Sequence, residues 1–420
     1  MSGQQRQRVP PGAETPGRVG DVRRGNLARV LTAIARWTSE QSPTRAQLAT
    51  LTGLTKASVS SLVTELIEQG LVVEIGQHRD GERGRPGVGL GLDPSRCVLG
   101  MEVNVDYVSA GLVNLSGQPI NHAVLPRDNR SSRPEEVTGA LGELITEYRN
   151  FATNQGLTIL GGALAIPGLV DSRNSLVLHA PNLGWDGIRL GLAGLLPDTL
   201  LGVSLFNEAN ASAVAYRQSV PQAPATFLFV SGEVGIGGAV VIDSELFTGP
   251  HGAAGEIGHV IVQPGGSPCS CGAHGCLETM AGQDAIYRAS GVLAPVRNPG
   301  QPVTTDPEPR ETIALLHAAL VAGEPQALDA VDRAGYYLGA AVASSARLLD
   351  VHTVVLGGHF AALGQWIVPA LHRSAADHGP ASGWPLRIIL SPLGATAALV
   401  GAAQSVVRDL LEHPPVATQR

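Results

Sequence analysis

Apolar residues in the first ninety positions recur at the spacing of amphipathic helices. The pattern predicts a helix over residues 27–37, a break at Pro43, a short helix capped by Thr44, and, after Gly53, a longer helix capped by Thr55. The apolar positions of these three helices are Leu27, Val30, Leu31, Ile34, Trp37, Leu48, Leu51, Val59, Leu62, Val63, Leu66 and Ile67.

The third of these helices has a polar face that its apolar stripe turns outward. Ala57, Ser58, Ser61 and Glu65 lie on that face, with Lys56 in the first turn. Small polar side chains suit a helix that enters a DNA groove. A helix, a short helix, a glycine turn and an exposed helix start together predict a helix-turn-helix.

A strand and an arginine-containing loop follow the third helix. Residues 70–75 predict the strand, and residues 77–88 a hairpin loop with Arg79, Arg83 and Arg85, which would act as a wing against DNA backbone or minor groove. A three-helix packing module without a DNA role is the alternative. The candidate DNA-binding residues are Arg45, Thr55, Lys56, Ala57, Ser58, Ser61, Arg83 and Arg85.

From Cys97 onward the pattern becomes one of strands that end in glycine or polar turns before helices. This arrangement occurs twice along the chain and predicts a two-lobed α/β body with a ligand cleft between its lobes. We therefore expect a disordered segment at residues 1–20, a winged helix-turn-helix at 21–90 and a body at 91–420. The body's expected elements cover residues 97–120 (three strands), 134–151 (helix), 158–166 and 200–206 (strands, the latter followed by a helix), 227–230 and 239–243 (strands around a glycine loop at 235–238), 336–349 (helix), 351–356 (strand) and 394–411 (helix).

The net charge of the chain also changes between the predicted winged helix-turn-helix and the predicted body. Residues 1–90 hold twelve basic against eight acidic residues, a net charge of +4, whereas the remainder holds seventeen against twenty-eight, a net −11. A basic head on an acidic body fits a head that binds nucleic acid. Lys56 is the only lysine, which excludes a lysine-dependent phosphate site in the body. Without an apolar run of membrane-spanning length or a signal segment, we expect a cytoplasmic protein with no membrane partner.

Three of the four cysteines lie within eight residues of one another, in a glycine-rich stretch. Cys269, Cys271 and Cys276, with His259 ten residues before the first, form a Cys3His set of the kind found in closed tetrahedral zinc sites. The spacing is not that of a zinc finger, so we expect a metal-stapled loop at residues 255–278. The alternatives are three buried thiols that bind nothing, or a disulfide, although Cys269 and Cys271 are too close to pair comfortably.

Two carboxylates flank these ligands. Glu256 precedes His259 by three residues and Glu278 follows Cys276 by two, so a metal-fixed loop would hold both in set positions. The second nitrogen of a bound imidazole normally meets a hydrogen-bonding partner, either a protein group or a ligand hydroxyl. Without a metal loop, both carboxylates would be ordinary solvated charges.

At this point the chain resembles the ROK family of repressors and sugar kinases. Residues 255–259 (GEIGH) and 269–278 (CSCGAHGCLE) are similar to its signature, and the likeness extends over nearly the whole chain from Asn26, as in its regulator branch of xylose or N-acetylglucosamine repressor type. The resemblance implies a winged helix-turn-helix followed by an actin-like, hexokinase-like (ribonuclease H-like) fold. It implies structural Zn²⁺ bound by His259, Cys269, Cys271 and Cys276, and a monosaccharide surrounded by Asn207, Glu208, Glu256, His259 and Glu278.

The chain departs from the kinase branch at three places. Residues 102–106 (EVNVD) stand where kinases resemble Asp-x-Gly-Gly-Thr, so two glycines of the first phosphate loop are missing and Asp106 would repel phosphate. Glu233 and Val234 stand where kinases carry Gly and Thr. Glu208 occupies the place of the catalytic aspartate and is one methylene longer, and a displacement of about 1 Å costs on the order of a hundredfold in rate.

These observations favour a DNA-binding regulator, a repressor of carbohydrate genes, whose operator affinity responds to a sugar or sugar derivative and which lacks kinase activity. We expect a homodimer or tetramer on an inverted-repeat operator. An active ATP-dependent sugar kinase with an appended DNA-binding module is one alternative. A regulator governed by a protein partner is another. Trp185 would either stack on a sugar face or lie in the core.

Overall fold

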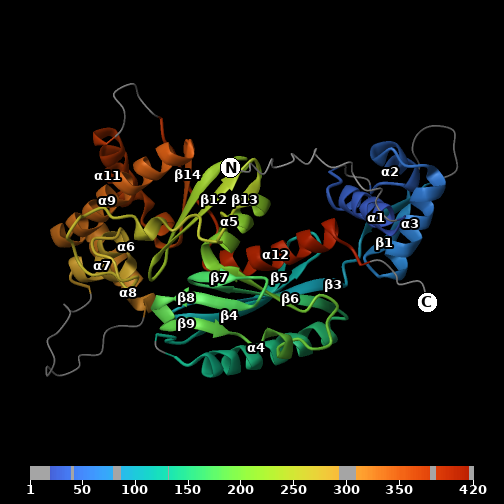
Figure 1. Ribbon diagram of the computed structural model, residues 1–420, viewed down its shortest axis with the longest axis horizontal. Coiled ribbons are helices and arrows are strands. Elements are labelled where there is room, and N and C mark those ends of the chain that lie inside the picture. Colours follow the sequence, from blue (N-terminus) through green and yellow to red (C-terminus); the bar gives the residue numbers. More distant parts are fainter. Residues whose placement is uncertain are drawn as a thin grey trace, which may run out of the picture. The chain divides into compact units, whose positions relative to one another are not determined.

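The computed structural model describes residues 19–38, 42–78, 87–130, 132–292, 309–378 and 385–415 (Figure 1). Contacts divide the chain into two compact units, Met1–Pro94 together with Val407–Arg420, and Ser95–Val406. The C-terminal residues thus group with the N-terminal ones, which the sequence pattern does not predict. Within the described ranges, every helix is too short or too polar to cross a bilayer.

The first unit is a winged helix-turn-helix, as the apolar pattern predicts. Its described secondary structure is helix α1 (Val19–Ala35), helix α2 (Arg45–Thr52), helix α3 (Lys56–Glu68) and the antiparallel hairpin of β1 (Val72–His78) and β2 (Gly87–Leu92). The predicted helix stripes supply its core, with Leu27, Val30, Leu31, Leu48, Val59 and Leu66 all fully buried. Of the segment 1–20 that was predicted to be disordered, residues 1–18 lie outside the described residues, and residues 19 and 20 belong to α1.

Caps set the ends of the second and third helices. Thr44 and Gln47 form a reciprocal capping box at the start of α2, and Gly53, with φ +71°, ends this helix in the left-handed conformation. The side chain of Thr55 accepts a hydrogen bond from the Ser58 N–H at the start of α3. The turn between the two helices therefore follows from residues visible in the sequence.

The prediction that Glu65 faces outward is wrong. Its side chain is buried, with 7% of the residue exposed, and accepts hydrogen bonds from Arg23 of α1. The ion pair replaces the hydration that a buried carboxylate loses. Glu65 therefore joins α3 to α1 and does not belong to the exposed face.

The second unit contains two five-stranded sheets of the same topology (Figure 1). In each, a three-stranded antiparallel meander is extended by two parallel strands. The first sheet has the order β10 (Val203–Asn207), β6 (Thr158–Ile166), β3 (Arg96–Val103), β4 (Tyr107–Asn114) and β5 (Pro119–Pro126). The second has the order β13 (Glu245–Phe247), β12 (Ile236–Ile242), β11 (Phe227–Gly232), β14 (Thr353–Gly357) and β15 (Arg387–Leu390).

Helices cover the sheets and define two lobes. Helix α4 (Pro134–Asn154) packs its apolar face on the first sheet. Helix α5 (Glu208–Ser219) covers one face of the second sheet, through contacts such as Tyr216 with Phe227 and Phe229. The other face is covered by α6 (Glu278–Ala281), α7 (Gln283–Ala289), α8 (Pro309–Ala322), α9 (Pro325–Leu349), α10 (Gly358–Ala362) and α11 (Gly364–Asp377). The predicted two-lobed α/β body is confirmed.

The closing helix α12 (Ala397–Glu412) begins in the second unit and ends in the first. In the second unit it lies against α5 so closely that a Cβ at Gly401 would stand 1.8 Å from the carbonyl oxygen of Ala211. In the first unit Leu411, near its end, accepts a hydrogen bond from the Thr32 hydroxyl, and Pro415 accepts one from Gln69. These contacts account for the grouping of the C-terminal residues with the N-terminal ones.

One local prediction is wrong, and one alternative that the sequence left open is decided. The glycine loop expected at residues 235–238 is mostly strand, because β12 already starts at Ile236 and the turn before it lies at residues 233–235. Trp185 is a core residue, 3% exposed, and its indole N–H donates to the carbonyl of Ser132. It opens β9 (Trp185–Arg189), which pairs with β8 (Leu176–Ala180), itself paired with β7 (Leu169–Asp171).

Candidate functional site

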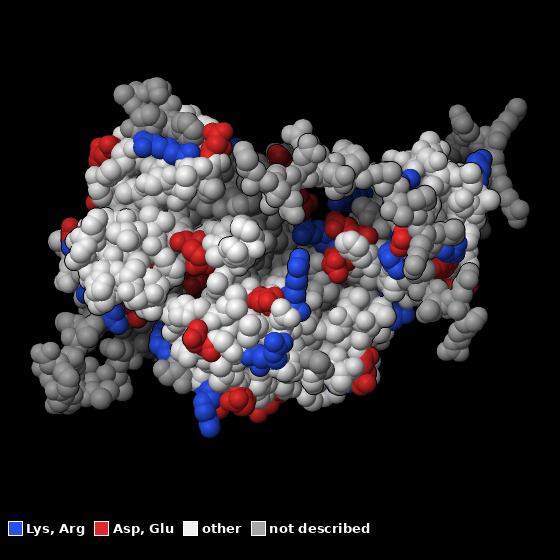
Figure 2. All heavy atoms as spheres, viewed as in Figure 1, with Lys and Arg blue, Asp and Glu red and all other residues white. Residues whose placement is uncertain are grey.

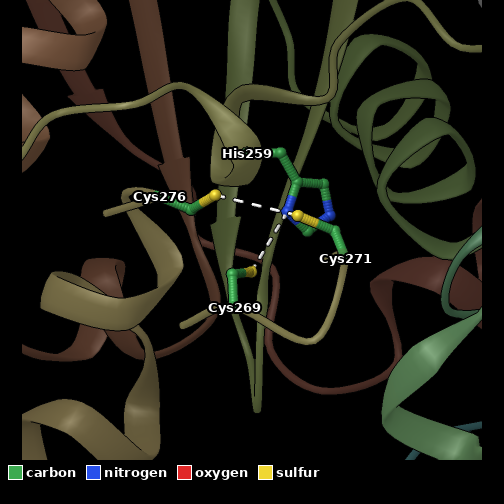
Figure 3. Close-up of side chains that lie close together, drawn as sticks. All are labelled: His259, Cys269, Cys271 and Cys276. Atoms are coloured by element: carbon green, nitrogen blue, oxygen red, sulfur yellow. Dashed lines mark hydrogen bonds between the residues drawn. The ribbon is translucent and has the colours of Figure 1, made fainter. Parts of the chain in front are cut away.

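One histidine and three cysteines form a compact cluster on the loop after β13 (Figure 3). The ligand atoms of His259, Cys269, Cys271 and Cys276 all lie within 4.8 Å of one another. The His259 Nδ1 is 3.7 Å from the Cys269 Sγ, and the Cys271 and Cys276 sulfurs are also 3.7 Å apart. All three cysteines are free thiols, so the disulfide alternative is wrong.

The cluster's geometry fits a tetrahedral metal ion. Zn–S bonds of about 2.3 Å place two sulfurs of a tetrahedron about 3.8 Å apart, close to the Cys271–Cys276 separation. Burial raises the pKa of the Cys276 thiol to about 12, whereas a backbone N–H from Ala273 lowers that of Cys271. A bound cation would favour the thiolate form of Cys276, and the four residues are able to hold one.

Glycine makes this loop possible. Gly275 has φ +74°, and a Cβ on it would stand 1.7 Å from the backbone oxygen of Gln263. The carbonyl of Gly275 accepts hydrogen bonds from the N–H groups of Val262 and Gln263, so two strands of the loop are drawn together there. This close approach brings Cys276 to the segment that follows His259, and Ile261 and Cys276 form a β-bridge.

His259 faces two ways. It ends the short helix η3 (Ile257–His259), with Nδ1 toward the thiols and Nε2 3.7 Å from the Glu256 carboxylate. Burial raises the pKa of Glu256, His259 lowers it in part, and Glu278 raises it again. The same imidazole therefore links the cysteine cluster with a carboxylate that lines the neighbouring cavity.

That cavity lies between the two lobes of the second unit and has a volume of about 80 Å³. The first lobe contributes the ends of β6 and β10 and the turn after β8, and the second lobe contributes the turn before β12 and the segments around Glu256 and Glu278. All five residues predicted to bind a sugar, Asn207, Glu208, Glu256, His259 and Glu278, line it.

These five residues are not equally free to bind a ligand. The Asn207 amide N–H donates to the Gly168 carbonyl and its oxygen accepts from the Asn210 N–H, capping α5. One oxygen of Glu278 accepts from the Ile236 N–H, and the other accepts from the Ser270 hydroxyl. Glu208 has no hydrogen-bond or ion-pair partner among the described residues, and burial, followed by the nearby Glu102, raises its pKa to about 8.

Several cavity residues were missed by the sequence analysis. Ser231, Glu233 and Asn182 line the cavity, and Glu102 and Tyr107 line a second cavity of about 10 Å³ beside it. Glu102 and Glu233 were noticed only as departures from a phosphate-binding pattern, and Asn182 only as a neighbour of Trp185. The available signal was that Glu102, Ser231, Glu233 and Asn182 lie at the end of a strand or just after one, on the side where ligands bind in α/β folds, whereas Tyr107 opens β4.

The predicted DNA-binding residues divide into three groups. Thr55, Lys56, Ala57, Ser58 and Ser61 are exposed at the start of α3. Arg45 is half-buried and paired with Glu74 of β1 at 2.8 Å, so it is tied to the hairpin. Arg83 and Arg85 lie outside the described residues. The face drawn in Figure 2 carries scattered charges of both signs on a mostly uncharged surface.

Two protein families match the two parts of the chain. The ROK family matches residues 98–408, and the MarR family matches residues 28–84. The xylose repressor of Caldicellulosiruptor bescii is 27% identical over 377 residues, which cover 89% of this chain and 94% of that protein. A glucokinase of Halalkalibacterium halodurans is 27% identical over 312 residues, covering 73% of this chain and 93% of the kinase.

Among solved structures, the chain is similar to a ROK family transcriptional regulator described as a homologue of the Escherichia coli MLC protein. The TM-score is 0.73 with 25% identity, covering 93% of this chain and 97% of the other. The family includes both repressors and kinases, and the similarity to the regulators extends through the winged helix-turn-helix, whereas the glucokinase matches 73% of the chain. With the ROK profile spanning residues 98–408 and the Cys3His loop in place, the chain belongs to the ROK family.

Proposed function

We propose that this protein is a DNA-binding transcriptional regulator, a repressor of carbohydrate uptake or metabolism genes, that responds to a sugar or sugar derivative. The observation that carries the proposal is the presence in one chain of two sites. A helix-turn-helix exposes the start of α3, and a cleft in a separate unit is lined by carboxylates and by His259. The similarity to a xylose repressor over both parts of the chain supports this division.

The first unit supports DNA binding through its shape and its exposed residues. Lys56 stands at the first turn of α3, whose start would reach base edges in a major groove, and the β1–β2 hairpin is the wing. A dimer would place two such helices one helical turn of DNA apart, which requires an inverted-repeat operator. We propose a homodimer or a dimer of dimers as the active form.

The cleft supports sugar binding because its side chains are hydrogen-bond acceptors. Carboxylates such as Glu256 and Glu278 accept from sugar hydroxyls, and a site that pairs each hydroxyl rejects analogues that lack one. We propose that Zn²⁺ is held by His259, Cys269, Cys271 and Cys276. The ion would fix the His259 ring and so hold Nε2 toward the cleft.

The charges in the cleft argue against kinase activity. Transfer of a phosphoryl group requires groups that stabilise negative charge, whereas Asp106 and Glu233 stand in the two loops where the family resemblance puts phosphates. Isothermal calorimetry with ATP, with and without candidate sugars, separates the two functions. Micromolar ATP affinity together with sugar-dependent ADP formation would contradict the proposed regulator without kinase activity. It would show an active kinase that carries a DNA-binding module.

Regulation requires that the sugar bind two arrangements of the protein unequally. A change in operator affinity of five- to about 150-fold corresponds to a coupling free energy of about 1 to 3 kcal/mol. We propose that lobe closure around the sugar changes the loop at residues 255–278 and, through the dimer, the spacing of the two recognition helices.

The test is a sugar panel scored by release of the protein from its own upstream DNA, followed by fluorescence anisotropy. E256Q and E278Q should remove the sugar's effect and leave operator affinity within about twofold of wild type, because both lie in the cleft and outside the helix-turn-helix unit. Loss of DNA binding in both variants would contradict this division of labour. A complete lack of sugar-dependent thermal shift across the panel would favour regulation by a protein partner instead.

A further inference from the structure

Three glutamates gather where the two cavities of the second unit meet. Glu208 and Glu233 line both cavities, and Glu102 lines the smaller one. They come from different elements: Glu102 from β3, Glu208 from the first residue of α5, and Glu233 from the turn before β12. The tertiary fold, and no local sequence motif, therefore brings them together.

These side chains lack protein cations to balance them. Neither cavity is lined by Lys or Arg among the described residues. Arg130 lies nearby but is paired with Asp106 at 2.7 Å. The carboxylates of Glu208 and Glu233 form no hydrogen bond or ion pair with any residue that the structure describes, whereas Glu102 accepts from the Tyr107 hydroxyl at 2.8 Å.

A hydroxyl beside them is also unused. Ser231 is 6% exposed and lines both cavities, and its Oγ has no hydrogen-bond partner within the described ranges. A buried hydroxyl without a partner is costly unless a ligand or water satisfies it. Together, Glu208, Ser231 and Glu233 present three acceptors around one point where the cavities join.

Burial makes it costly for the three glutamates to ionise. Burial raises the pKa values of Glu102, Glu208 and Glu233 to about 8 each, and each carboxyl raises that of a neighbour. The carboxyls thus hold protons near neutral pH until a cation arrives. Other titratable groups around them are Tyr107, which faces Glu102, Asp106 and Tyr287, which lie near Glu233, and His359, whose pKa burial lowers to about 4.

Size limits what this cation is. The smaller cavity has a volume of about 10 Å³, which holds about one water-sized group, while the larger one has about 80 Å³. A primary ammonium is of that size and carries three N–H donors and no acceptor, which matches the three acceptors. A phosphate group is too large for the smaller cavity.

We infer that the effector is an unphosphorylated amino sugar, with its ammonium group bound between Glu208, Ser231 and Glu233 and its hydroxyls facing Glu256, His259 and Glu278. This inference rests on the proposed function, because it names the class of effector for the same cleft. It predicts that sugar phosphates and acidic sugars are not effectors of this protein. The proton held by the carboxyls leaves when the ammonium binds.

The test compares matched sugars on the full-length protein by isothermal calorimetry. D-glucosamine is compared with D-glucose and N-acetyl-D-glucosamine, D-galactosamine with D-galactose, and D-glucosamine 6-phosphate with D-glucosamine. At least one amine should bind at least tenfold more tightly than its hydroxyl counterpart, about 1.4 kcal/mol. Its titration in buffers of different ionisation enthalpy should show net proton release, and its 6-phosphate should bind at least tenfold more weakly.

Variants at the three-acceptor point locate the ammonium. E208Q, E233Q and S231A should each reduce the advantage of the amine over its hydroxyl counterpart to about threefold or less. E143Q, on the exposed face of α4, should keep the full advantage. Circular dichroism and thermal melting check that each variant is folded. If E208Q or E233Q melts early, the result for S231A, which removes one oxygen only, decides the test.

The outcomes separate this inference from the proposed function. Equal binding of amines and neutral sugars, absence of binding by every amine, or stabilisation by Mg²⁺ or K⁺ in place of amines would each overturn the ammonium assignment. If neutral sugars still release operator DNA, the proposed function survives without it. If an amine binds as expected but operator affinity does not change, the ammonium site stands and the sugar-responsive repressor is wrong.

Discussion

At the scale of single residues, Glu102 offers a pH-dependent test of the buried carboxylates. It is 1% exposed, and burial raises its pKa from 4.5 to about 8. The folded state therefore holds a proton that the unfolded state loses, so the contribution of Glu102 to stability is fully present below pH 4.5 and is lost as pH rises toward 8. The loss from this one group is at most about 1.4 kcal/mol per pH unit.

E102Q stays neutral, so its melting temperature should fall less between pH 6 and 8 than that of the wild-type protein. The glutamine still accepts from the Tyr107 hydroxyl, which keeps the packing. E143Q, which removes an exposed carboxylate, should follow the wild-type curve. Parallel curves for E102Q and wild type would mean that Glu102 ionises normally in the folded protein.

Two glycines of the metal loop give a second residue-scale prediction. Gly265 and Gly275 both have φ +74°, but only at Gly275 would a Cβ meet the Gln263 backbone, at 1.7 Å. G265A should cost about 1 kcal/mol of left-handed strain. G275A should cost at least 2 kcal/mol more and lower the metal content per chain, as measured by melting and elemental analysis. Equal effects of the two substitutions would contradict the close approach at Gly275.

Residue identities also show where sequence reasoning stopped. The Cys3His set was visible because its members lie within eighteen residues of one another, and the structure brings the four side chains together. The glutamate group was not visible, because Glu102, Glu208 and Glu233 are far apart in the sequence and meet only when two lobes form. Glu65 was misplaced because a charged residue was assumed to be exposed, whereas Arg23 pairs with it.

At the scale of elements, helix α3 carries the DNA prediction. Lys56 is exposed in its first turn, where a side chain reaches a phosphate. K56A should weaken operator and non-specific DNA binding by similar factors and reduce the slope of log affinity against log salt by about 1. K56R keeps the charge and should keep the slope. An unchanged slope in K56A would remove Lys56 from the DNA contacts.

Most elements were predictable because their periodicity is strong. Helices α2, α3 and α4 and the strands β3, β4, β6, β11 and β14 lie within a few residues of their expected places, whereas α1 starts at Val19, eight residues before its expected start. The small sheet of β7, β8 and β9 was not predicted, since its strands are three to five residues long and only partly buried. Helix α9 starts at Pro325, well before its predicted start, because polar and charged residues interrupt its apolar pattern.

At the scale of the whole molecule, the helix-turn-helix lies in one unit, and the cleft and the Cys3His cluster lie in the other. Removing the proposed Zn²⁺ with a strong chelator should lower the melting temperature of the Ser95–Val406 unit by roughly 4 °C or more and abolish the sugar response. Operator affinity without sugar should stay within about threefold, because the helix-turn-helix contains none of the four ligands.

Elemental analysis, differential scanning calorimetry and operator titration check this prediction on the same sample, with C97S as a control for the buried cysteine outside the cluster. Metal-free protein that is fully folded and still released from DNA by sugar would contradict a role of the cluster in stability and in the sugar response. Return of the response on adding Zn²⁺, but not Mg²⁺, would identify the ion's chemistry as that of thiolate and imidazole ligands.

Under the proposed function, the two-sided imidazole of His259 would make the sugar response depend on metal supply. The Nδ1 atom faces the thiols and Nε2 faces the Glu256 carboxylate in the cleft. An ion bound on the Nδ1 side would therefore hold the ring in position for a sugar on the Nε2 side. In a bacterium starved of zinc, newly made copies would still occupy their operators but would no longer be relieved by sugar. Growth on that sugar would then stall from a shortage of trace metal while the carbon source is plentiful.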